Sequence, residues 1–140
     1  SFKNVIPNTT WFKQGERRTI KKINSKIITL DDYCSKNNIT QIDILKIDTQ
    51  GYEDKVLGGA IELLKHGKIK IIQLELIFSE IYENPLQIYD VEKYLIPNKY
   101  KLFGISNGGS LISHSIYSSD HIYISFDTYE NFKKKKVTIF

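Results

Sequence analysis

Two carboxylic acids stand where apolar segments of the chain end, and acids in such positions can carry chemistry. Asp48 directly follows the apolar segment 42–47, and Glu75 lies close to the end of the apolar segment 69–76. A pair of carboxylates can deprotonate a hydroxyl, orient it, or hold a divalent cation. Asp48 can equally be a turn or helix-capping residue. Glu75 is harder to explain without a function, because an unpaired carboxylate inside a buried strand is costly.

The other titratable residues carry weaker signals. Glu53 falls in the first turn of an expected helix, where the helix dipole alone favours an acid. His66, His114 and His121 do not have the spacing of a metal-ligand set, and we predict no metal site. Cys34 is the only cysteine, which excludes a disulfide within the chain and a site built from several thiolates. An unpaired cysteine favours a reducing compartment, and we expect a cytoplasmic protein.

The segments around the two acids predict a β-α-β unit. Residues 42–47 are expected to form a mostly buried strand, a helix follows from Glu53 to the residue before Gly67, and residues 69–76 form a second strand. Strand, helix and strand within about 35 residues predict parallel strands with a right-handed crossover. Because ligands bind outside the carboxyl ends of such strands, the two acids should face one crevice. The apolar face of the helix would consist of Val56, Leu57, Ala60, Leu63 and Leu64.

Flanking segments extend this unit into an α/β arrangement. Residues 17–30 are predicted as a hairpin or a bent edge strand, and residues 31–36 as a short helix that Asp31-Asp32 caps. Segments 101–106 and 121–126 are predicted strands, antiparallel because no helix separates them. Another helix is expected to begin at Asn84-Pro85, with Leu86, Tyr89 and Leu95 on its apolar face.

Length and charge limit the possible classes. The chain has 140 residues, 41% of them hydrophobic, which suits one folded domain and excludes intrinsic disorder. Its net charge of +4 comes from a basic lead-in, residues 1–27, and a Lys-rich tail, residues 133–140, around an acidic core of residues 28–132. This distribution indicates no nucleic-acid partner, and no apolar run is long enough to span a membrane.

Several motifs, taken in order, resemble the FkbM family of methyltransferases. That family has a Leu-Asp-Asp segment, a strand ending Leu-Lys-Ile-Asp, a Glu-Gly-x-Glu turn, a helix with Val-Leu-x-Gly-Ala, and a strand carrying a glutamate. One position departs from the pattern, because Gln50 stands where the family usually has glutamate. The corresponding residues here are Leu30-Asp31-Asp32, Leu45-Lys46-Ile47-Asp48, Gly51-Tyr52-Glu53, Val56-Leu57-Gly58-Gly59-Ala60 and Glu75.

The resemblance implies a fold and a reaction. The fold is α/β, part of a Rossmann-like class I methyltransferase sheet, with a parallel βαβ core and an antiparallel C-terminal strand pair. The reaction is transfer of a methyl group from S-adenosylmethionine to a hydroxyl of a sugar or natural product. Under this resemblance Asp48 and Glu75 act as base or acceptor-orienting residues with support from Glu53, while Gln50 and Tyr52 bind the acceptor.

The cofactor site is expected outside this sequence. In the family a Gly-rich turn between a strand and a helix holds the cofactor, whereas Gly58-Gly59 falls within the predicted helix. We therefore expect this turn to lie upstream of Ser1. The chain would then be the C-terminal part of a methyltransferase domain, and we expect the chain alone to bind the cofactor poorly. The chain also lacks methionine, which fits a piece of a longer protein.

Two other classes of function stay open. The chain could be a non-catalytic remnant that packs with a partner supplying the rest of the sheet. It could also be a basic RNA-binding module that uses its Lys-rich ends and Trp11, with an affinity that falls steeply as salt rises. The acidic core argues against the second alternative, because it would repel a polyanion.

Overall fold

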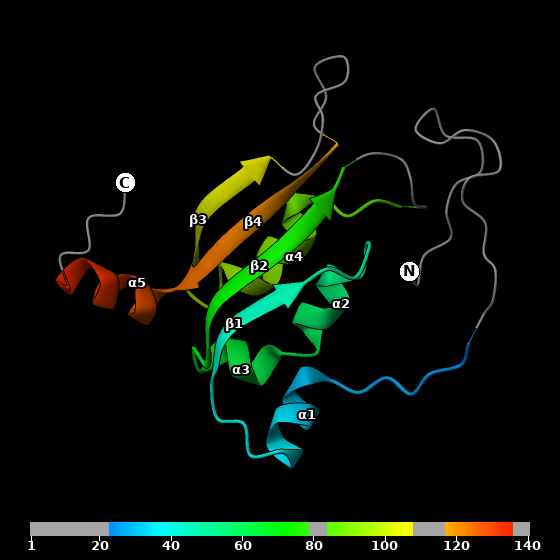
Figure 1. The fold of residues 1–140 in the computed structure, drawn as a ribbon, viewed down its shortest axis with the longest axis horizontal. Coiled ribbons are helices and arrows are strands. Elements are labelled where there is room, and N and C mark those ends of the chain that lie inside the picture. The colour runs from blue at the N-terminus through cyan, green and yellow to red at the C-terminus, as the bar shows by residue number, and fades with distance from the viewer. Residues whose placement is uncertain (1–22, 79–83, 108–116, 136–140) are drawn as a thin grey trace.

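The computed structural model describes residues 23–78, 84–107 and 117–135 (Figure 1). In these ranges helices and strands alternate along the first part of the chain, and a strand pair and a final helix follow. In chain order they are α1 (Leu30–Lys36), β1 (Ile42–Ile47), α2 (Glu53–Gly58), α3 (Ile61–Lys65), β2 (Ile69–Ile77), α4 (Ile88–Leu95), β3 (Tyr100–Asn107), β4 (Ser118–Ser125) and α5 (Phe126–Lys134).

The described strands form one four-stranded sheet in the order β1-β2-β4-β3. β1 and β2 are parallel, with Ile47 opposite Leu74. β4 is antiparallel to both of its neighbours. Its Asp120 lies opposite Glu75 of β2 on one side and opposite Ser106 of β3 on the other. The predicted βαβ unit and the antiparallel C-terminal pair are thereby confirmed, and the fold is a partial Rossmann-like α/β sheet.

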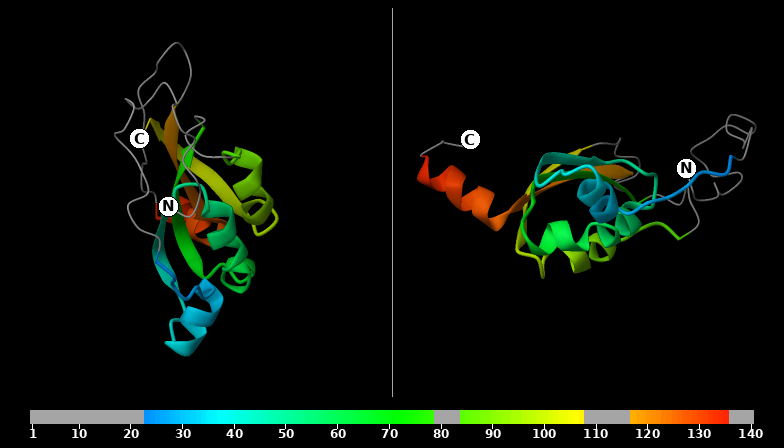
Figure 2. Two further views of the ribbon diagram at one scale, coloured as in Figure 1. Left: turned by 90° about the vertical axis from the view of Figure 1, so that its right-hand side faces the viewer. Right: turned by 90° about the horizontal axis from the view of Figure 1, so that it is seen from below.

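Helices cover one face of this sheet. Figure 2 shows α2, α3 and α4 on the same side of the strands, and no helix of the described ranges lies on the other side. Alternate side chains of β2 point toward the helices and form the core with them, whereas the side chains between point to the helix-free face. The core residues from β2 and the helices include Ile72, Leu74, Leu76, Leu57, Leu64, Val91 and Leu95.

The helix predicted from Glu53 to His66 is divided in two, α2 and α3, at Gly59-Ala60. Its predicted apolar face is nevertheless correct, because Leu57, Ala60, Leu63 and Leu64 are all buried. Gly67 ends α3 in the left-handed conformation, at a φ of 59°, as its position predicts.

A carboxylate from α1 caps the second of these helices. The side chain of Asp31 accepts hydrogen bonds from the backbone N–H groups of Glu62 and Leu63, at 2.9 and 3.0 Å. The predicted role of Asp31-Asp32 as the cap of α1 is therefore wrong. Thr29 caps α1 instead, because its Oγ1 accepts from the N–H of Asp32 at 3.1 Å. The break before α3 creates new unpaired N–H groups, and Asp31 satisfies them.

Replacing Asp31 by alanine should lower the free energy of unfolding by about 1–2 kcal/mol, because an N-terminal helix cap and the tie between α1 and α3 are both lost. Urea unfolding measures this change. Asp32→Ala is the matched control, since the neighbouring side chain is exposed and should change stability by less than about 0.5 kcal/mol. Equal losses in the two variants would contradict the capping role.

Two predicted strands differ from the structure. β1 is an edge strand of the described sheet rather than a mostly buried one, and Ile44 is 64% exposed. Residues 23–29 of the predicted hairpin form no strand. The remainder of that segment lies outside the described residues, as do Trp11 and His114.

Two predicted helices also need correction. α4 begins at Ile88 rather than at Asn84-Pro85, because Gln87 and Asp90 form a reciprocal capping box there. On this helix Val91 is buried, whereas Tyr89 is 73% exposed and does not belong to the apolar face. α5 was not expected; it takes up the first residues of the predicted Lys-rich tail. In the described ranges no helix combines the length and the apolar character that crossing a bilayer demands.

Candidate active site

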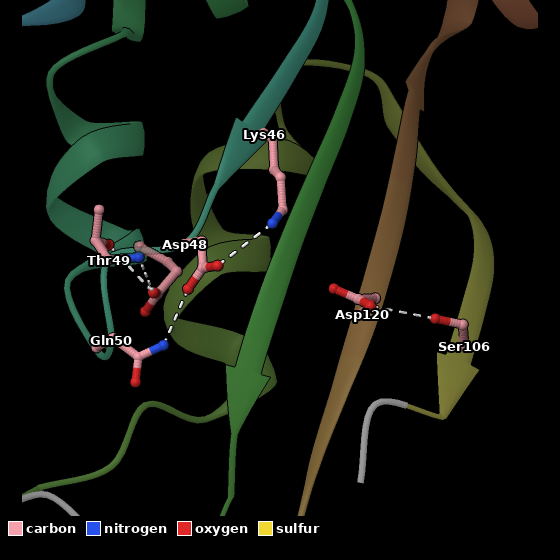
Figure 3. Close-up of polar contacts among 7 residues, drawn as sticks. Lys46, Asp48, Thr49, Gln50, Ser106 and Asp120 are labelled. Carbon is pink, nitrogen blue, oxygen red and sulfur yellow. Dashed lines mark hydrogen bonds and ion pairs between the residues drawn. The ribbon is translucent and has the colours of Figure 1, made fainter.

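Asp48 is the first residue after β1, at the carboxyl edge of the parallel strands. Its Oδ1 accepts a hydrogen bond from Nε2 of Gln50 at 2.9 Å, and its Oδ2 pairs with Nζ of Lys46 at 3.3 Å (Figure 3). The Gln50 hydrogen bond, assisted by Lys46, lowers the pKa of the Asp48 carboxyl below its usual 3.8. The side chain keeps 42% of its surface exposed, so an ionised, oriented carboxylate faces solvent.

Glu53 fixes the loop that carries Asp48. It is 2% exposed, and its Oε1 accepts from both the N–H and the Oγ1 of Thr49, at 3.0 and 3.1 Å. Its Oε2 accepts from the N–H of Gly51 at 3.0 Å. The loop needs these bonds, since Gln50 and Gly51 both have positive φ angles of 57° and 98°. A positive φ is unfavourable for a non-glycine residue such as Gln50, and such conformations persist only where neighbours enforce them.

Asp48 and Glu75 come directly after the last pair of residues between the two parallel strands. That last pair is Ile47 of β1 and Leu74 of β2. Glu75 is half-buried, and Asp120 of β4 lies opposite it on its other side. The predicted meeting of the two acids at one edge is thus consistent with the register. Within the described ranges, no three His, Cys, Asp or Glu side chains are close enough to hold a metal ion.

Tyr52 occupies a different part of the molecule from Glu75. Together with Thr49 it lines a largely apolar cavity of about 580 Å³ between α1, α2 and the segment that precedes α1. The loop after β1 therefore presents its acid on one side and an apolar cavity on the other. Other residues of the cavity wall are Ile27, Ile28, Leu30, Tyr33 and Val56.

Sequence reasoning missed Asp120 and Ser106. Ser106 Oγ donates to Oδ2 of Asp120 at 3.4 Å, and Figure 3 shows this pair across β2 from Asp48. The signal was obscured because the last strand was predicted to start at His121, whereas β4 starts at Ser118. Counted from the true start, Asp120 alternates with buried residues and falls on the face of Glu75.

A second polar pair lies under the helices. Ser119 Oγ and His121 Nε2 are 2.8 Å apart, and both residues are buried. Nδ1 of the histidine has no hydrogen-bond partner in the described part of the chain. Burial lowers the pKa of His121 below its usual 6.5, although the nearby carboxylates of Glu92 and Asp120 act in the opposite direction. Burial therefore favours the neutral form of this histidine in the folded state.

Stability should consequently depend on His121 at mildly acidic pH. Since the folded state lowers this pKa, the unfolded state binds the proton more readily, and the free energy of unfolding falls as pH drops below about 6.5. The slope from this residue is at most about 1.4 kcal/mol per pH unit. Urea midpoints across this range should vary less in His121→Gln than in His66→Gln, whose histidine is exposed. The same pH dependence in both variants would contradict the assignment.

The sheet is consistent with part of a Rossmann-like methyltransferase fold. β1 and β2 are parallel with helices between them, and an antiparallel strand pair follows. A comparison with protein families agrees: the model described as "Methyltransferase FkbM domain" matches residues 2–111. The chain belongs to the FkbM methyltransferase family.

One curated protein is similar to a part of this chain. The 2-O-methyltransferase NoeI of Sinorhizobium fredii is 37% identical over 59 residues, which are 42% of this chain and 24% of that protein. The chain thus spans about a quarter of the length of the relative it matches. No solved structure matches the chain.

Proposed function

We propose that this chain is the acceptor-side part of an O-methyltransferase that uses S-adenosylmethionine to methylate a hydroxyl of a sugar or a related natural product. The observation that carries the proposal is the Asp48 carboxylate, ionised and oriented by Gln50 and Lys46 at the carboxyl edge of the sheet. Family membership supports methyl transfer, and the name of the relative, a 2-O-methyltransferase, supports an oxygen as the acceptor.

Asp48 would orient the acceptor hydroxyl. The hydroxyl donates its hydrogen bond to the carboxylate, which turns an oxygen lone pair toward the methyl donor. Because the pKa of Asp48 is lowered, the group is a weak base. We therefore assign it to orientation and to accepting the hydroxyl proton late, as the oxygen becomes positively charged, before that proton passes to water.

The surrounding residues would bind and position the acceptor. Glu75 would accept a hydrogen bond from a second hydroxyl of the acceptor. Gln50 donates a hydrogen bond to the Asp48 carboxylate, so it would act on the acceptor partly through Asp48. Glu53 would act as a positioning residue, because it holds the loop that carries Asp48. Tyr52 would contact only a part of the acceptor that extends past the loop into the apolar cavity, because this cavity lies on the other side of the loop from Asp48.

The Gly58-Gly59 pair does not form the Gly-rich turn that would hold the cofactor. Gly58 belongs to α2 and Gly59 caps its end, so neither lies in a turn between a strand and a helix. S-adenosylmethionine supplies an electrophilic methyl group when bound, and we assign its Gly-rich turn to sequence upstream of Ser1. Cys34 is a buried free thiol, in keeping with a reducing compartment, and we place the reaction in the cytoplasm.

Isothermal titration with S-adenosylmethionine tests this proposal. The full-length gene product should release or absorb heat on binding one equivalent of the cofactor, whereas the 140-residue chain should give no signal. A full-length protein that folds but does not bind the cofactor would contradict the proposal and favour the non-catalytic remnant.

A further inference from the structure

Polar side chains form a row across the helix-free face, close to the carboxyl edge of the parallel strands. Glu75 and Ser106 are the direct neighbours of Asp120 on the two adjacent strands, and Asp48 follows the end of β1. Directly opposed residues of neighbouring strands point to the same face of a sheet. β2, β4 and β3 therefore each contribute one polar group to a single row, and Asp48 lies just past the last residue of β1 that pairs with β2.

The acids of this row are poorly compensated. Lys46 pairs with Asp48, but Glu75 has no hydrogen bond or ion pair with any residue in the described ranges. Among the described residues, the only hydrogen bond that Asp120 accepts through its side chain is the long one from Ser106, at 3.4 Å. Like charges directly opposite each other on neighbouring strands destabilise a sheet. We therefore expect the Glu75–Asp120 pair to lower stability, which is typical of residues kept for binding.

A buried hydroxyl beside the row lacks a partner. Ser118 is 1% exposed, and its Oγ makes no hydrogen bond with any residue that the structure describes. It precedes Asp120 by two residues on β4, so both side chains point to the same face, with Ser118 nearer the carboxyl edge. A buried polar atom without a partner is costly and rare in folded proteins. This hydroxyl is the second, independent sign that the row takes a polar ligand.

The chemistry of the row selects a type of ligand. Carboxylates accept hydrogen bonds from hydroxyls, whereas the serine hydroxyl can both donate and accept. No three acids lie close enough to hold one metal ion in the described part of the chain, so a cation explains the row less well than several separate hydroxyls do. A ligand that carries its own carboxylate or phosphate would be repelled by the row.

We propose that Asp120, Ser118 and Glu75 form the specificity half of the acceptor site and select a neutral polyhydroxylated ring over an anionic one. The inference rests on the proposed function, in which Asp48 orients the hydroxyl that is methylated. Asp120 and Glu75 accept hydrogen bonds from the other hydroxyls of the ring, and Ser118 supplies a further contact. The C-terminal hairpin, through β4, thereby determines which acceptors are used.

Acceptor kinetics of the full-length enzyme test the inference. The probes are a panel of neutral methyl glycosides, each paired with its uronate, in which a carboxylate replaces the primary alcohol. We expect kcat/KM to be at least about tenfold higher for the neutral glycoside, because the acids of the row would repel the carboxylate of the uronate. Asp120→Asn should raise KM for the neutral sugar several-fold and reduce the ratio of kcat/KM values between the neutral sugar and its uronate. It should leave kcat and the KM for S-adenosylmethionine unchanged.

Three further variants separate binding from folding. Asp120→Glu keeps the charge and should keep the preference for neutral sugars. Ser118→Ala removes the unpartnered hydroxyl, so it should raise the acceptor KM while the urea midpoint stays equal or rises. Asp127→Asn on α5 is the matched control and should match the wild type, because this acid is exposed and lies outside the row.

Two outcomes would overturn the inference alone: equal use of neutral sugars and uronates by the wild type, or Asp120→Asn and Ser118→Ala enzymes with wild-type acceptor KM values. A full-length enzyme that methylates neither member of any pair would contradict the proposed function, and this inference with it.

Discussion

Replacing Asp48 by asparagine in the full-length protein should lower kcat for methyl transfer by about 100-fold or more, the range seen when a group that handles the reacting proton is removed. The amide keeps the shape of the side chain and can still accept the hydrogen bond from Gln50, but it loses the charge that orients the acceptor hydroxyl. Binding of S-adenosylmethionine should not change, since Asp48 acts on the acceptor. The measurement is single-turnover transfer of a labelled methyl group.

Asp43→Asn provides a matched control for this variant. Asp43 lies near the start of β1, at the opposite end of this strand from Asp48, and it also pairs with a lysine, Lys70 at 2.6 Å. Both acids are exposed, so each change should alter stability by less than about 0.5 kcal/mol. If Asp48→Asn retains wild-type kcat, or if both variants lose activity equally, Asp48 does not orient the acceptor.

Glu53→Gln should disrupt the loop that holds Asp48. A single carboxylate, 2% exposed, accepts the N–H and Oγ1 of Thr49 and the N–H of Gly51, and an amide can replace only part of this set. We expect a loss of about 2–3 kcal/mol in the free energy of unfolding, because hydrogen bonds to a buried charged group are lost. We also expect kcat to fall about tenfold, because displacing a positioned group is costly to the rate.

Amide hydrogen exchange distinguishes this local effect from general destabilisation. The Thr49 and Gly51 amides should lose protection in Glu53→Gln. The Leu74 amide in the core of β2 should lose protection only in proportion to the fall in the global free energy of unfolding. Glu62→Gln is the control, since that glutamate is exposed on α3 and pairs only with surface groups. Unchanged protection at Thr49 and Gly51 would show that Glu53 does not hold the loop.

The βαβ unit was predictable because its signals are local. The apolar strand before Asp48, the helical spacing of Leu57 and Leu64, and the glycine at position 67 each follow from short-range geometry, and the structure confirms them. The break between α2 and α3 was not predictable in the same way. Its stabilising cap comes from Asp31, about 30 residues away, and a long-range contact leaves no trace in local periodicity.

The candidate site was predictable only in part. Asp48 and Glu75 were found because an acid at the end of an apolar strand is conspicuous. Asp120 was missed because Ser118-Ser119-Asp120 has the composition of a turn, and only pairing with β2 makes it a strand. The exposure of β1 also depends on which strands lie beside it, and that is tertiary information.

The most direct test of the account is to identify the product of the reaction. The full-length protein is incubated with S-adenosylmethionine carrying a labelled methyl group and a neutral saccharide, and the product is examined by mass spectrometry and NMR. The account predicts a saccharide with the label on one oxygen, formed by the wild type and by Asp43→Asn and greatly reduced with Asp48→Asn. A folded, cofactor-binding wild type that labels no hydroxyl, or an Asp48→Asn enzyme that labels it at the wild-type rate, would contradict the account.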